Sequence, residues 1–85
     1  MKVLYFAWLR QTIGVDEEDV APPAGVADVA GLIAWLKTRG ANYAKALNDP
    51  SMVRVAVNQE YVQPNHALAP DDEVALFPPV TGGAA

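Results

Sequence analysis

The fold is decided by the stretch VADVAGLIAWLKTR at residues 26–39, whose apolar spacing has the period of a helix. Four large apolar side chains recur at positions i, i+3, i+4 and i+7, so they form one stripe along the helix. These four residues are Val29, Leu32, Ile33 and Leu36. Asp28 lies in the expected first turn, where the helix dipole favours a negative charge. The stretch therefore predicts an amphipathic helix that needs a sheet or another helix to cover.

Strand signals lie on both sides of this helix. Before it, residues 3–9 are an uninterrupted apolar run, which predicts a strand buried on both faces. The acidic run at residues 16–19 predicts a solvated loop that leads into a short edge strand at residues 19–21. After the helix we expect a short second helix and then three strands, at residues 41–48, 52–57, 61–62 and 73–77.

This order of elements, two strands, a helical region and three strands, defines the expected fold class. It predicts an α+β fold in which one main helix packs across one face of a mixed sheet of about four to five strands. The right-handed crossover rule places the first and last strands near the middle of that sheet. This is the β-grasp, or ubiquitin-like, arrangement. We expect one β-grasp domain at residues 1–79 and a flexible C-terminal tail at residues 80–85 that carries Gly82 and Gly83.

Composition excludes several classes of function. The 85-residue chain is 52% hydrophobic and 19% charged, which is typical of a globular protein. Its net charge of −4 disfavours nucleic acid and favours a partner with a basic surface. The chain has no cysteine and one histidine, His66, so we expect no disulfide, no thiolate catalysis, no catalytic triad and no metal site. No apolar run could span a membrane, and we expect a cytoplasmic protein.

The end of the chain is the strongest functional signal. Pro78 and Pro79 hold the backbone extended as it leaves the last expected strand. Gly82 and Gly83 then give a segment without side chains, and the six residues 78–83 reach roughly 20 Å when extended. A stiff spacer with a slim end suits insertion into a narrow channel of another protein. The alternative is that these are ordinary terminal residues without a function.

Three segments resemble a known family. They are Lys2-Val3-Leu4-Tyr5-Phe6-Ala7, Val57-Asn58-Gln59-Glu60-Tyr61-Val62 and Asp72-Glu73-Val74-Ala75-Leu76-Phe77-Pro78-Pro79-Val80-Thr81-Gly82-Gly83. Together with Arg10, Gly14 and Leu68, they are similar to the small, sulfur-carrier subunit of molybdopterin synthase. The likeness covers residues 2–83, and the last segment is its most specific part.

The resemblance implies a β-grasp fold and a defined role for the terminal glycine. An ATP-dependent adenylyltransferase, similar to ubiquitin-activating enzymes, would convert the Gly83 carboxylate to an acyl adenylate. Sulfur from a donor would then replace AMP to give a thiocarboxylate. The loaded tail would enter the large, catalytic subunit, in a two-plus-two heterotetramer, and give its sulfur to cyclic pyranopterin monophosphate. The carrier would then be no enzyme by itself, and would hold no permanent cofactor, since ATP is used by the activating enzyme.

The resemblance and the strand alternation together nominate binding residues. Phe6 and Phe77 fall on the face of the sheet that the main helix leaves open, and Tyr61 could join them in a docking surface. Arg10 matches a family position and could help to hold the partner or the tail. The alternative is that it is an ordinary solvated charge on the surface. The spacer adds the partner-binding residues Pro78, Pro79, Val80 and Thr81. Two tryptophans, Trp8 and Trp35, are expected in the core, with Trp35 at its rim.

Ala84 and Ala85 depart from the family, whose members end at the second glycine. Three alternatives stay open: residues added for expression, a precursor end that a protease removes, and a native tail. Two other functions also stay open. One is a sulfur carrier for another pathway, such as thiamine thiazole synthesis, and the other is a β-grasp interaction module with an inert tail.

Overall fold

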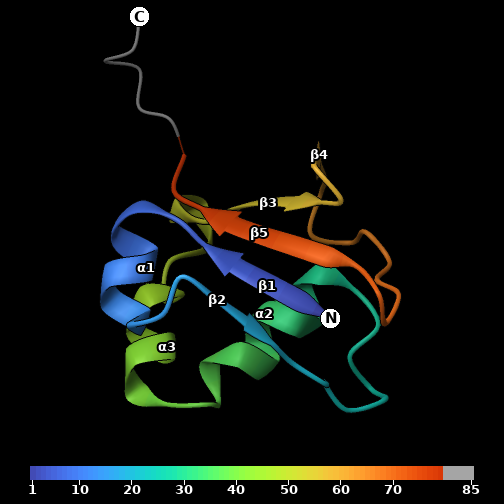
Figure 1. Ribbon diagram of the computed structural model, residues 1–85, viewed down its shortest axis with the longest axis horizontal. Coiled ribbons are helices and arrows are strands. Elements are labelled where there is room, and N and C mark those ends of the chain that lie inside the picture. Colours follow the sequence, from blue (N-terminus) through green and yellow to red (C-terminus); the bar gives the residue numbers. More distant parts are fainter. Residues whose placement is uncertain (80–85) are drawn as a thin grey trace, which may run out of the picture.

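The computed structural model, which describes residues 1–79, is a five-stranded sheet with helices on one side (Figure 1). In chain order its elements are β1 (Lys2–Tyr5), α1 (Ala7–Ile13), β2 (Glu17–Asp19), α2 (Val29–Lys37), α3 (Ala41–Ala46), a 3₁₀ turn (Pro50–Met52), β3 (Arg54–Val57), β4 (Glu60–Tyr61) and β5 (Glu73–Phe77). The last strand matches its predicted bounds. The prediction of a solvated loop for the acidic run is wrong, because residues 17–19 pair with β1 and are themselves the edge strand. Helix α1 was not predicted.

The strands lie in the order β2-β1-β5-β3-β4, with the first and last strands of the chain side by side near the middle. β1 and β5 run parallel, and every other pair is antiparallel. This confirms the expected mixed sheet and the β-grasp topology. The acidic strand β2 forms one edge of the sheet, where charged side chains deter pairing between molecules.

The core fills the space between the sheet and the three helices. Val3 and Tyr5 of β1 and Val74 and Leu76 of β5 are at most 1% exposed. Val29, Leu32 and Leu36 of α2 meet them and are fully buried, while the fourth residue of the predicted stripe, Ile33, packs at the edge. Because α1 and α3 add Leu9, Ile13 and Ala46 to the same cluster, all three helices cover one face and leave the other face open.

Helix α2 begins three residues later than predicted. Asp28 is its N-cap, and the Oδ1 atom of this residue accepts a hydrogen bond from the Gly31 amide at 2.7 Å. The first two amides of the helix bond to the loop before β5: the Val29 amide donates to the His66 carbonyl, and the Ala30 amide donates to the Pro64 carbonyl. Residues 26–27 are thereby excluded from the helix, since the Ala27 carbonyl accepts instead from the Leu68 amide.

The prediction of a single strand at residues 3–9 is wrong, because the chain turns after Tyr5. Phe6 is extended and donates its amide to the Leu76 carbonyl at 3.1 Å, and Ala7 then adopts a positive φ of 56°. Helix α1 follows, with Leu9 and Ile13 buried one turn apart. Trp8 lies on the outside of this helix and is 38% exposed, so its prediction as a core residue is wrong.

The β3–β4 hairpin turns through two residues, Asn58 and Gln59. Both have positive φ, 51° and 71°, which is the pattern of a type I′ turn. Asn58 suits its position, and it also joins the hairpin to β5: its Oδ1 atom accepts from the Glu73 amide, and its Nδ2 atom donates to Asp72 at 2.9 Å. Gln59 has a β-carbon in a conformation that favours glycine.

We therefore expect Gln59→Gly to stabilise the protein by about 0.5–1 kcal/mol, because relief of the left-handed strain exceeds the added entropy of the unfolded chain. Chemical denaturation measures the change. Gln59→Ala is the matched control, since it removes the same side chain but keeps the β-carbon, and it should change stability little. Equal stabilities of the glycine and alanine variants would contradict the strain argument.

Candidate functional site

The candidate site lies where β5 leaves the sheet. Along this strand, Val74 and Leu76 point into the core, whereas Ala75 and Phe77 point to the open face, as the alternation predicts. Pro78 and Pro79 follow directly and are half-buried. They continue the chain beyond the ends of the neighbouring strands (Figure 1). The predicted site residues Val80, Thr81, Gly82 and Gly83 lie outside the described residues.

Three aromatic residues surround this point, and we name Phe6, Tyr61 and Phe77 the exit patch. The Tyr61 and Phe77 rings contact each other with centroids 5.6 Å apart. Phe6 follows Tyr5, the partner of Leu76 in the parallel pair, so it lies beside Phe77 at the end of the two central strands. Tyr61 is 84% exposed and Phe6 47%. Exposed aromatic surface of this kind is typical of a protein-binding site.

A shallow hollow of about 290 Å³ adjoins the exit patch. Besides Tyr61 and Phe77, it is lined by Arg54, Gln63 and two valines. Arg54 pairs with Phe77 across β3 and β5. It was not among the predicted site residues, although the alternation of Val53 and Val55 already places the residue between them on the opposite face. Arg10, in contrast, lies with residues of the α1–β2 turn such as Gly14 and Asp16.

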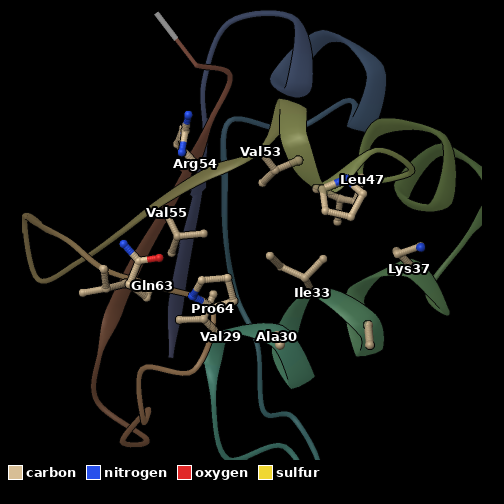
Figure 2. Close-up of a pocket in the computed structure, with 13 residues that line it drawn as sticks. Val29, Ala30, Ile33, Lys37, Leu47, Val53, Arg54, Val55, Gln63 and Pro64 are labelled. Carbon is tan, nitrogen blue, oxygen red and sulfur yellow. The ribbon is translucent and has the colours of Figure 1, made fainter.

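A second hollow, of about 400 Å³, lies on the other face of the sheet, between β3 and helix α2. In Figure 2, Val53 just before β3, Val55 of β3 and Ile33 of α2 extend into the space between the two elements. No carboxylate, histidine or hydroxyl lines this hollow within residues 1–79. Lys37 is the one lining residue of a type used in acid–base or nucleophilic catalysis, and the lining offers it no carboxylate or histidine as a partner.

The densest group of ionisable side chains is centred on Glu18 of β2. Its Oε2 atom accepts hydrogen bonds from the Tyr5 and Tyr43 hydroxyls at 2.7 and 2.8 Å, and its Oε1 atom accepts from Arg39 at 2.9 Å. The Arg39 guanidinium in turn lies 5.3 Å from the ring centroids of Tyr43 and Trp35, which holds Trp35 at the rim as predicted. Every group thus bonds to another member of the cluster, so we assign the Glu18 cluster a structural role.

The pKa values in this cluster follow from its contacts. Burial alone would raise the pKa of Glu18, but the two tyrosine hydrogen bonds and the charge of Arg39 outweigh it, and the pKa is lowered. Burial first, and then the Glu18 carboxylate, raise the pKa of Tyr5 far above its ordinary value. At neutral pH the cluster is one ionised carboxylate held by three donors.

Among residues 1–79, no group of three or more histidine, aspartate and glutamate side chains is placed to hold a metal ion. In the same part of the chain, no helix has the length and apolar character needed to cross a membrane.

The topology, the open sheet face and the exit patch define a small β-grasp protein of the ubiquitin-like class. The model of the ThiS family matches residues 3–83, a span that ends on the second glycine. The chain belongs to the ThiS family. The resemblance to molybdopterin synthase sulfur carriers is also confirmed, by relatives in two distant organisms.

The Escherichia coli molybdopterin synthase sulfur carrier subunit is 42% identical over 83 residues, which cover 98% of this chain and 99% of that protein. The human protein of the same name is 34% identical, covering 98% of this chain and 93% of its own. Among solved structures, SAMP1 from Haloferax volcanii superposes with a TM-score of 0.74 at 29% identity, covering 98% of both chains.

The Glu18 cluster generates a stability prediction. Glu18→Gln removes the charge that Arg39 and the buried Tyr5 hydroxyl require, so we expect a loss of about 1–3 kcal/mol at neutral pH. Because folding lowers the pKa of Glu18, its contribution is present above the pKa of the unfolded chain and is lost as the pH falls through the folded value. The difference between wild type and variant should therefore shrink in acid.

Denaturation curves at neutral pH and at about pH 3 measure this difference. The control is Glu17→Gln, on the same strand, whose carboxylate lies 3.5 Å from Lys2 at the surface and should contribute little. A Glu18→Gln deficit that stays constant over this pH range would show that the loss comes from packing and not from the charge.

Proposed function

We propose that this chain is a sulfur carrier that works as the small subunit of molybdopterin synthase. The observation that carries the proposal is the exit of β5, where the chain passes the exit patch and continues through Pro78 and Pro79 toward Gly82 and Gly83. The family match through both glycines and the names of the relatives support it. The exit patch would serve as the docking surface, and the segment beyond it would be the part that enters the partner.

The proposed chemistry takes place at the Gly83 carboxylate and needs two displacements. A carboxylate is a poor electrophile, so one of its oxygens first attacks the α-phosphate of ATP, pyrophosphate leaves, and an acyl adenylate forms. A sulfide-level sulfur donor then attacks the acyl carbon, AMP leaves, and the product is a thiocarboxylate. Glycine suits both steps because no side chain obstructs the attacked carbon.

The carrier would supply no acid, base or metal to these reactions. An adenylyltransferase of the ubiquitin-activating type would load the tail, and the large synthase subunit would supply the catalytic residues that move the sulfur to cyclic pyranopterin monophosphate. The assembly would hold two carriers and two large subunits. We place the protein in the cytoplasm, and we propose that Arg10, Pro78, Pro79, Val80 and Thr81 join the exit patch in binding its partners.

Intact mass spectrometry tests the loading step. The 85-residue chain, a version that ends at Gly83 and a control version that ends at Thr81 are each incubated with ATP, the activating enzyme and a sulfur donor. We expect the mass gain of one oxygen-to-sulfur exchange in the Gly83 version alone, which would also mark Ala84 and Ala85 as residues to be removed. No gain in any version, with an enzyme that loads another carrier, would leave an interaction module as the better account.

The destination of the sulfur distinguishes a carrier for molybdopterin from a carrier for thiamine thiazole synthesis. The loaded Gly83 version is mixed with either the large synthase subunit and cyclic pyranopterin monophosphate or a thiazole synthase and its substrates. Sulfur should pass only to the pterin. Transfer only to the thiazole would assign the carrier to thiamine synthesis.

Docking through the exit patch predicts that Tyr61→Ala separates binding from stability. Because the Tyr61 side chain is largely exposed, its removal should change the free energy of unfolding by less than about 1 kcal/mol. Binding to the large subunit should weaken by about tenfold or more, as for an aromatic interface anchor. Met52→Ala, an exposed apolar change outside the patch, is the control. Equal affinities of the two variants would remove Tyr61 from the interface.

A further inference from the structure

The open face of the sheet carries its charges unevenly. Strand pairing identifies the residues that share this face: Lys2, Leu4, Glu17, Asp19, Arg54, Ala56, Tyr61, Glu73, Ala75 and Phe77. The acidic members lie toward β2 and the start of β5, where Lys2 neutralises part of their charge through Glu17. At the exit of β5, the open-face residues of the described strands are the aromatic ones and a single cation, Arg54.

Arg54 lies at the surface, and residues 1–79 offer it no counterion. Its side chain is exposed, and no carboxylate of residues 1–79 lies within salt-bridge distance of it. Across the sheet it pairs with Phe77, and it lines the same hollow as Tyr61 and Gln63. The cation therefore borders directly on the contacting rings of Tyr61 and Phe77.

A protein that covers these rings must also cover Arg54. Burying a guanidinium without a counter-charge is costly, whereas a carboxylate that meets it can accept two parallel hydrogen bonds. A partner that presents an acidic side chain at this point gains affinity, and one that presents a basic or purely apolar surface loses it. At the acidic side of the open face, near Asp19 and Glu73, a partner instead gains affinity from a basic side chain.

We infer that Arg54 selects the partner that docks on the exit patch, by pairing with an acidic side chain of that partner beside the point where the tail enters. The partner is the protein that receives the tail, so the inference rests on the proposed function. Its docking surface is acidic and apolar at the tail entrance and basic at the far side. The overall charge of −4 would have suggested a uniformly basic partner surface, and the structure assigns the reverse sign to this part of it.

Titration calorimetry with the Gly83-ended chain and the large subunit of molybdopterin synthase from the same organism tests this inference. Arg54→Glu reverses the charge and should weaken binding by about tenfold to a hundredfold. Arg54→Gln should weaken it less and reduce its dependence on salt concentration. Lys45→Glu is the matched control, because it makes the same change in net charge at an exposed position on α3, and its affinity should stay within about twofold of wild type. Thermal melts confirm that each variant is folded.

Equal losses for Arg54→Glu and Lys45→Glu would overturn the inference, since net charge alone would then explain them. Tighter binding by Arg54→Glu would overturn it too, because the partner would be basic at this point. In both cases wild-type binding and sulfur transfer would persist, so the proposed function would stand. A wild-type chain that neither binds the large subunit nor transfers sulfur would overturn the function and the inference together. Recovery of Arg54→Glu binding by an acid-to-lysine change in the large subunit would support the pairing directly.

Discussion

The parallel pairing of β1 with β5 is the constraint on which the rest of the structure depends. Two strands from opposite ends of the chain can lie parallel at the centre of a sheet only if the connection between them crosses one face, and α2 occupies that face. The pairing also brings Phe6 beside Phe77, because both strands end on the same side of the sheet. The core, the open face and the exit of the chain all follow from it.

A chain of this size can support the proposed role because the role asks little of the folded part. The domain has to hold one end of a peptide at a recognisable surface, while the reactive atoms lie beyond it. Two groups of polar side chains serve folding instead: the Glu18 cluster joins edge strand β2 to β1, to α3 and to Arg39 just beyond α2, and Asn58 and Asp72 join the hairpin to β5.

The main helix and the last strand could be predicted because each has a strong local signal: a 3.6-residue period and a two-residue alternation. The exit patch followed from alternation together with the family resemblance. Helix α1 could not be predicted, since Val3 to Leu9 reads as one apolar run and the turn depends on a hydrogen bond from Phe6 to Leu76, seventy residues away. The Glu18 cluster was missed for a similar reason, because its four members come from separate elements.

The helices pack on one face of the sheet and leave the exit patch on the other, and this has a consequence for the order in which partners bind. Within residues 1–79, the exit patch borders the end of β5, and two proteins that both dock on it cannot bind at once. Any enzymes that bind the exit patch must therefore bind it one after another, and one must release the carrier before the next can bind. Dissociation from the exit patch is then a required step between one partner and the next.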